Sequence, residues 1–185
     1  MPGLSKDYFE KYIQGFSKNF FKDYPYFLET GTHKAQTSLL MKELFERVDT
    51  IEVNSKFYNE NIKKYHDSGI NFHFGDSGKI IKDIVPNLDK PTVFFFDAHG
   101  AYHEGQVGEK DVPLYEEISE IVNNFKHKAI IIVDDFRLFG TKSKICDWSY
   151  INKETVLNLL KQRDEKLYHA PSKRTETDRL IIHLK

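Results

Sequence analysis

Apolar residues are spaced along this chain in two ways, as short continuous runs and at intervals of three and four. Two runs, 92–96 and 129–133, are apolar at every position after the first. Such runs are typical of strands buried on both faces, in the middle of a parallel sheet. Elsewhere apolar residues recur at helical spacing, as Leu39, Leu40 and Leu44 do. The chain is therefore expected to alternate between strands and helices.

The same pattern, combined with the Gly and Pro residues that interrupt it, predicts the elements. Strands are expected at 26–30, 50–54, 70–74, 92–97, 129–133, 165–170 and 178–184, and helices at 5–20, 34–47, 55–66, 78–85, 113–126 and 152–162. Five successive strand–helix units call for a doubly wound parallel sheet with helices on both faces. The last two strands have no helix between them, so they are expected to be antiparallel. The expected fold class is α/β, a Rossmann-like seven-stranded sheet with an antiparallel C-terminal hairpin.

Size and composition fit one folded domain. The chain has 185 residues, of which 39% are apolar and 14% aromatic, which is enough to bury a core. We expect a single domain over 1–185. An amphipathic helix within 1–22 is expected to pack on its core.

Net charge and cysteine content indicate which partners and which cellular compartment to expect. The net charge is −1 at pH 7 and the pI is about 6.7, which gives no electrostatic reason to expect a nucleic-acid or membrane partner. Cys146 is the one cysteine, and no long apolar run lies near the N-terminus. These features are typical of a cytoplasmic protein. The sequence leaves the oligomeric state open.

Acidic residues fall at or just beyond the end of each successive strand. They are Glu29, Glu52, Asp76, Asp97 and Asp134. The carboxyl ends of parallel strands meet at one edge, where open α/β sheets bind their ligands, so these acids are expected to line one crevice. Helix capping accounts for one or two of them. A ligand site explains the whole set better.

The residues at these strand ends resemble the motifs of class I S-adenosylmethionine-dependent methyltransferases, over about residues 24–185. Glu29-Thr30-Gly31 matches the first motif, Glu52 matches the acid that binds the ribose hydroxyls, and Gly75-Asp76-Ser77 looks like the adenine segment. The resemblance implies S-adenosyl-L-methionine as cofactor, bound by Glu29, Thr30, Gly31, Thr37, Glu52, Asp76, Ser77 and Asp97. One departure is that the first motif has a single glycine, with Ala35 where a further small residue is usual.

The chemistry of these residues agrees with the resemblance. A carboxylate accepts hydrogen bonds from both ribose hydroxyls in bidentate fashion. The glycine fingerprint of nicotinamide-binding proteins is missing from the sequence.

A second set of acids follows the fourth and fifth strands. Asp97, Asp134 and Asp135 come from neighbouring strand ends and would repel one another without a cation among them. Oxygen ligands favour Mg²⁺, with other divalent ions as alternatives. The arrangement resembles the metal-dependent sugar O-methyltransferases of the macrocin and mycinamicin type. It differs in having His99 where that group commonly has another acid.

The loop after the fourth strand carries the candidate base. His99 and His103 both follow Asp97, and histidine suits proton transfer near neutral pH. The expected function is O-methylation of a sugar or glycan hydroxyl, with His99 and Asp97 as the catalytic residues and His103 as the other candidate base. A catechol or phenol acceptor is the second choice, and a non-catalytic S-adenosylmethionine-binding module is the third. A nucleic-acid methyltransferase is disfavoured because the sequence has no basic stripe.

Overall fold

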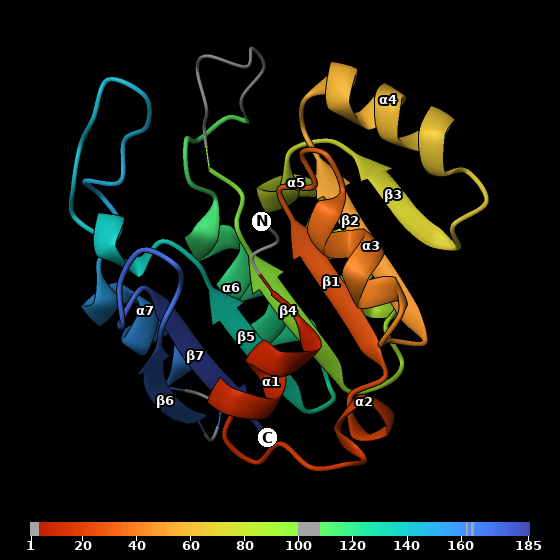
Figure 1. Cartoon of the computed structure of the whole chain (residues 1–185). Helices are drawn as coiled ribbons and strands as arrows, with labels where there is room; N and C mark the ends of the chain where they lie inside the picture. Colours follow the sequence, from red (N-terminus) through yellow and green to blue (C-terminus); the bar gives the residue numbers. More distant parts are fainter. Residues whose placement is uncertain (1–3, 100–107, 162, 164) are drawn as a thin grey trace.

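The computed structural model of the chain describes residues 4–99, 108–161, 163 and 165–185. Its centre is a seven-stranded sheet in the order β3-β2-β1-β4-β5-β7-β6 (Figure 1). The strands are β1 (Tyr26–Thr30), β2 (Arg47–Glu52), β3 (Ile70–Phe74), β4 (Thr92–Phe96), β5 (Ala129–Val133), β6 (Glu165–Ala170) and β7 (Arg179–Leu184). The first five are parallel, and β7 is antiparallel to both β5 and β6. The predicted fold class is confirmed.

Helices cover both faces of the sheet (Figure 1). They are α1 (Lys6–Tyr12), α2 (Phe20–Asp23), α3 (Gln36–Lys42), α4 (Ser55–Tyr65), α5 (Ser77–Ile84), α6 (Leu114–Asn124) and α7 (Lys153–Leu160), with 3₁₀ turns η1 (Val85–Asn87) and η3 (Phe136–Leu138). Residues of α5, α6 and α7 form one apolar cluster with the sheet, and residues of α1, α2 and α3 form the other. Among the described helices, none has the length and apolar character needed to cross a membrane.

Three elements differ most from the sequence-based expectation. The helix expected at 34–47 is α3, Gln36–Lys42, because the chain turns into β2 and that strand already begins at Arg47. β2 runs over Arg47–Glu52 instead of 50–54, because its pairing with β1 begins at Tyr26 and Arg47. The polar residues Arg47 and Asp49 concealed the start of this strand. The single helix expected at 5–20 is instead two short helices, since the chain leaves helical geometry after Tyr12 and Gly15 has a φ of +81°.

The N-terminal segment packs on the sheet through aromatic side chains. Phe9 of α1 is fully buried, and its ring centroid lies 5.5 Å from that of Phe20 and 5.8 Å from that of Phe45. Phe45 in turn lies 5.3 Å from Phe27 of β1. The aromatic residues whose spacing predicted one helix therefore pack together as a continuous aromatic layer over the centre of the sheet.

Removal of one ring from this layer should destabilise the whole domain. Phe9→Ala is expected to lower the free energy of unfolding by about 3–5 kcal/mol, because it removes a fully buried side chain and leaves a cavity. Urea denaturation measures the change. The exposed Lys11→Ala on the same helix is the control and should change stability by less than about 0.5 kcal/mol. Equal effects from both variants would mean that α1 is not part of the core.

Candidate active site

Backbone hydrogen bonds continue past the ends of the parallel strands and tie the candidate site residues to one another. The amide of Gly31 donates to the carbonyl of Ile51 at 3.0 Å, and that of Gly75 donates to Glu52 at 2.9 Å. On the other side of β1, Asp97 donates to Thr30 at 3.2 Å. Each residue that follows a strand is therefore held in register with its neighbour, at the edge where α/β sheets bind ligands.

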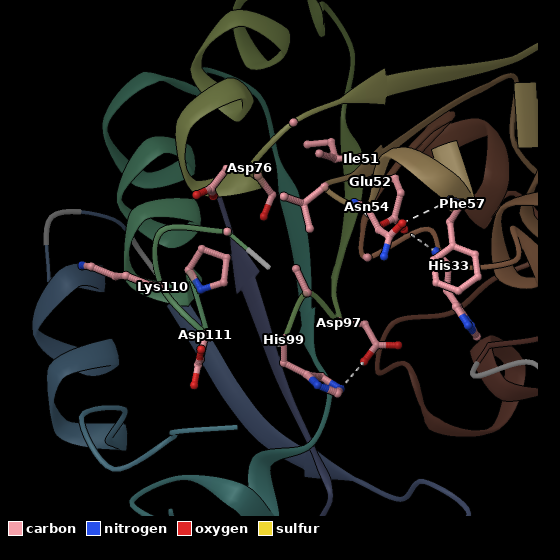
Figure 2. A pocket seen from close by; sticks show the side chains of 17 residues that line it. His33, Ile51, Glu52, Asn54, Phe57, Asp76, Asp97, His99, Lys110 and Asp111 are labelled. Atoms are coloured by element: carbon pink, nitrogen blue, oxygen red, sulfur yellow. Dashed lines mark hydrogen bonds and ion pairs between the residues drawn. The ribbon is translucent and has the colours of Figure 1, made fainter. Parts of the chain in front are cut away.

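A cavity of about 240 Å³ lies at this edge (Figure 2). Its lining comes from the segments that follow β1, β2, β3 and β4 and from the segment that leads into α6. It includes Gly31, His33, Glu52, Asn54, Phe57, Gly75, Asp76, Ser77, Asp97, His99, Lys110, Asp111 and Pro113. Of the predicted cofactor-binding residues, the structure brings Gly31, Glu52, Asp76, Ser77 and Asp97 together around one space.

Gly31 is required by both conformation and space. Its φ is +85°, which side-chain-bearing residues rarely adopt. A Cβ atom at this position would lie 2.7 Å from the carbonyl oxygen of Asp97. A glycine here lets the turn after β1 lie directly against the end of β4.

The Glu52 carboxylate is fixed at the cavity wall by two backbone amides. Its Oε2 accepts a hydrogen bond from His33 N at 2.6 Å, and its Oε1 accepts one from Asn54 N at 2.7 Å. The side chain is 7% exposed, and burial raises its pKa in spite of these bonds. Each carboxylate oxygen has a second lone pair, so Glu52 retains the capacity to accept hydrogen bonds from hydroxyl groups of a ligand.

Asp76 and Ser77 join the turn after β3 to the segment before α6. Asp76 caps α5 by accepting from Gly78 N at 3.0 Å, and its other oxygen accepts from Glu109 N at 2.7 Å. Ser77 donates to Glu117 Oε1 at 2.6 Å. Glu117 lies on α6 and is 1% exposed, and burial raises its pKa to about 7. These bonds hold one wall of the cavity together.

Three of the predicted cofactor residues, Glu29, Thr30 and Thr37, are not part of the cavity lining. Glu29 is 2% exposed and accepts hydrogen bonds from Ser38 and Thr37 of α3 and from Thr50 of β2. Burial raises its pKa to about 7. The physical reason is that Glu29 lies inside β1 and not beyond it, so its side chain turns toward α3. Thr37 is hydrogen-bonded to Glu29, and Thr30 is fully buried at the end of β1.

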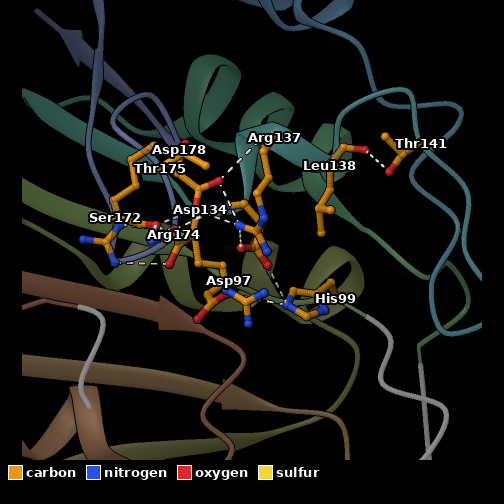
Figure 3. Close-up of polar contacts among 12 residues, drawn as sticks. Asp97, His99, Asp134, Arg137, Leu138, Thr141, Ser172, Arg174, Thr175 and Asp178 are labelled. Atoms are coloured by element: carbon orange, nitrogen blue, oxygen red, sulfur yellow. Dashed lines mark hydrogen bonds and ion pairs between the residues drawn. The ribbon is translucent and has the colours of Figure 1, made fainter.

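The acids that follow β5 are paired with arginines (Figure 3). Asp134 accepts from Arg179 at 3.1 and 3.2 Å through its two oxygens. Asp135 is hydrogen-bonded to Arg137, and its Oδ2 lies 3.2 Å from His99 Nε2. Asp178, which precedes β7, accepts from Arg137 at 2.8 and 2.7 Å. Each of these carboxylates therefore already has a cationic partner.

His99 lies between two carboxylates. Its Nε2 is 3.2 Å from Asp135 and 3.8 Å from Asp97, and its ring packs against Trp148 with centroids 5.8 Å apart. Burial alone would lower the pKa of His99, but its hydrogen bonds to Asp135 and Cys146 outweigh burial and raise the pKa to about 10. Burial and the nearby Asp134 carboxylate raise the pKa of Asp97 well above its ordinary value.

Among the described residues, two groups of possible metal ligands have their ligand atoms within 4.8 Å of one another. One group is Asp97, His99 and Asp135, and the other is Asp134, Asp135 and Asp178. The predicted metal ligands Asp97, Asp134 and Asp135 do not form such a group. His99 and Arg137 are paired with Asp135, and Arg179 is paired with Asp134. At Asp134 and Asp135 this donor set fits a divalent cation poorly, because arginines take up oxygen atoms that the metal would need, whereas Asp97 has no arginine or lysine partner among the described contacts.

Several site residues were not predicted from the sequence. No sequence motif indicated a site role for His33, whose backbone amide donates to Glu52 and whose ring packs against Phe57 with centroids 4.6 Å apart. Arg179, Asp178 and Glu117 had no local signal, because each contacts its partner across 40 or more positions. The other candidate base, His103, lies outside the described residues.

No protein-family model matches the sequence, and no curated protein matches it. Solved structures do match the fold. The O-methyltransferase TomG from Streptomyces achromogenes, involved in tomaymycin synthesis and bound to S-adenosylmethionine, aligns with a TM-score of 0.57 and 17% identity over 90% of this chain and 75% of that one. An O-methyltransferase from Bacillus cereus bound to S-adenosylhomocysteine aligns with a TM-score of 0.57 and 13% identity over 90% and 76%.

The chain has the fold of these S-adenosylmethionine-dependent methyltransferases. The same fold also occurs in the 23S rRNA methyltransferase ErmE, which aligns with a TM-score of 0.50 and 12% identity over 88% of this chain and 62% of that one. One of these structural relatives is named for tomaymycin synthesis and another for 23S rRNA methylation, so the acceptor of this chain must be inferred from its own residues.

The buried acid beneath Ser77 should make stability depend on pH. A carboxyl group with a raised pKa in the folded state stabilises the fold at low pH, and this contribution is lost as pH rises from about 4.5 through about 7. Glu117→Gln keeps the acceptor for Ser77 without the charge. We expect the variant to be more stable than wild type at pH 8 by about 3 kcal/mol and nearly equal at pH 4.5. Urea denaturation at the two pH values measures this, and an unchanged pH dependence would contradict the burial of a titrating Glu117.

Proposed function

We propose that this protein is an S-adenosylmethionine-dependent O-methyltransferase that acts on a hydroxyl of a sugar or glycan. The observation that carries the proposal is the meeting of Gly31, Glu52, Asp76 and Asp97 around one cavity, in a chain with the methyltransferase fold. These residues are far apart in sequence, and they meet because each lies at the end of a different parallel strand. A purely structural role would not need an acid fixed by two amides at a cavity wall.

In this proposal each wall of the cavity binds one part of the cofactor. Glu52 accepts the two ribose hydroxyls, since it lines the cavity and has no arginine partner among the described contacts. Gly31 also lines the cavity, and its lack of a side chain lets the β1 turn lie against Asp97. Asp76 and Ser77 bind the adenine end. The acid-rich lining suits a sulfonium cation.

The acceptor is proposed to bind in a hollow that adjoins the cavity and shares Lys110 and Asp111 with it. The other lining residues are Glu109, Lys142, Ser143, Lys144, Asp147 and Tyr150. Acidic and basic side chains are balanced in number, and the one aromatic residue is Tyr150. Donors and acceptors of both charges beside an aromatic ring suit a polyhydroxylated acceptor better than an apolar phenol.

The reaction requires one proton transfer. The acceptor oxygen forms a bond to the methyl carbon as the carbon–sulfur bond breaks, the electron pair returns to sulfur, and S-adenosylhomocysteine leaves. Asp97 and His99 are the proposed catalytic pair. His99 Nε2 faces two carboxylates. We therefore propose that Asp97 accepts the proton of the acceptor hydroxyl and that His99 holds the Asp97 carboxylate in place. This differs from the expectation that His99 is the base.

Experiment can distinguish this proposal from four alternatives. A metal-dependent form of the reaction, with Mg²⁺ on Asp97, Asp134 and Asp135, would make methyl transfer sensitive to EDTA. A catechol-type enzyme or a non-catalytic cofactor-binding module would bind S-adenosylhomocysteine equally well. An RNA acceptor is disfavoured by the net charge of −1.

The proposal predicts cofactor binding that depends on Glu52. S-adenosylhomocysteine should bind with a 1:1 stoichiometry in calorimetry, and Glu52→Gln should weaken binding by about 1.5 kcal/mol or more, roughly tenfold, because one charged acceptor is lost. Glu43→Gln removes an exposed carboxylate near the end of α3 and is the matched control. No binding to the wild-type protein, or equal binding by both variants, would contradict the proposed cofactor site.

The acceptor class can be tested with radiolabelled S-adenosylmethionine. Methyl transfer is expected to glycans or nucleotide sugars, and not to catechols or RNA. Asp97→Asn should lower the rate by about 10²-fold or more, the usual contribution of a positioned base, whereas the exposed Asp67→Asn should leave it unchanged. Label transferred to catechol alone would replace the sugar proposal, and an undiminished rate in Asp97→Asn would remove Asp97 from the chemistry.

A further inference from the structure

Four carboxylates gather where β4 and β5 end, those of Asp97, Asp134, Asp135 and Asp178. Like charges repel strongly in a partly buried site. A protein can offset this repulsion with a divalent cation or with its own cationic side chains. A bound cation needs carboxylate oxygens that no other group occupies, whereas internal neutralisation needs basic side chains beside the acids. The residues around these four carboxylates tell which of the two applies.

Arg179 is the first internal cation. It is 3% exposed and holds both oxygens of Asp134. Its guanidinium carbon lies 4.5 Å from the ring centroid of Tyr8 and 5.6 Å from that of Phe95. Since Tyr8 belongs to α1 and Phe95 to β4, the guanidinium is fixed between the N-terminal helix and the sheet.

Arg137 is the second internal cation, and it bridges two acids. Its Nη1 donates to Asp135 and to both oxygens of Asp178. The backbone holds it there, because Phe136 N donates to the carbonyl of Asp178 at 2.7 Å. Asp178 is 1% exposed and also accepts from Ser172 at 2.5 Å. The guanidinium therefore lies within the three-acid group of Asp134, Asp135 and Asp178.

We infer that Arg137 and Arg179 take the place of a divalent cation in this protein, and that Arg137 prevents the acid cluster from binding one. A metal in that group would have to displace a guanidinium that cannot lose its charge. The displaced arginine, 23% exposed at its side chain, would then lie unpaired beside the metal. Among the described contacts, the hydrogen bonds from the Arg137 side chain to carboxylates all use Nη1.

The test is a manganese titration, followed by the electron paramagnetic resonance signal of free Mn²⁺. Wild-type protein should leave the signal unchanged, and EDTA should not shift its melting temperature. Arg137→Met removes the bridging charge and should bind Mn²⁺ at least about tenfold more tightly than wild type, because ligand charge sets the affinity of such sites. Mn²⁺ should then raise the melting temperature of this variant.

Two further variants keep the result interpretable. Arg137→Lys retains a cation at this position and should behave like wild type even if Arg137→Met does not fold. Arg47→Met breaks a similar pair with the buried Asp49, whose other charged partner among the described residues is His73, and should be destabilised without rescue by Mn²⁺. Tight Mn²⁺ binding by wild type, a lower melting temperature in EDTA, or no gain of affinity in Arg137→Met would each overturn the inference.

Discussion

The parallel pairing of β1 with β2 on one side and β4 on the other is the constraint on which the site depends. Thr30 lies opposite both Ile51 and Phe96, so the three strands end level with one another. The ladder then continues beyond the strands, from Gly31 to Ile51 and from Asp97 to Thr30. These bonds fix the position of the turn at Gly31. The turn can lie against the end of β4 because Gly31 has no side chain. Position at the strand end, and not proximity in sequence, therefore assembles the cavity.

The second constraint is charge. The edge that collects the strand ends also collects carboxylates, and the fold offsets their repulsion in two ways. Glu29 and Glu117 are buried under the cavity, and burial raises the pKa of each to about 7. Near β5 the carboxylates are instead paired with arginines, and Arg137 and His99 lower the pKa of Asp135 to about 2 in spite of its burial. Among the acids that line the cavity, Glu52, Asp76 and Asp97 have no arginine or lysine partner in the described contacts, and Glu52 is the one held by backbone amides of the β1 and β2 turns.

Much of this arrangement follows from local sequence. The continuous runs at β4 and β5 identified buried parallel strands, and Asp97 after β4, together with Glu52 and Asp76, indicated the edge that lines the cavity. Asp134 after β5 was expected in the same crevice but is not part of the lining. Glu29 shows the limit of that reasoning, since the pattern places an acid near a strand end without fixing which layer its side chain enters. The partners of Asp134 and Asp135 show a second limit of reasoning from local sequence. Arg179 contacts Asp134 from 45 positions away, and no local spacing predicts which distant side chain will neutralise a given acid.

The proposed cofactor site depends most directly on Glu52 at the end of β2. A crystal structure of the protein with S-adenosylhomocysteine tests this dependence. The two ribose hydroxyls should donate to the Glu52 carboxylate, with the adenine against Asp76 and Ser77 and the sulfur on the side of Asp97. A ligand bound elsewhere, or in this cavity with Glu52 directed away from the ribose, would contradict it.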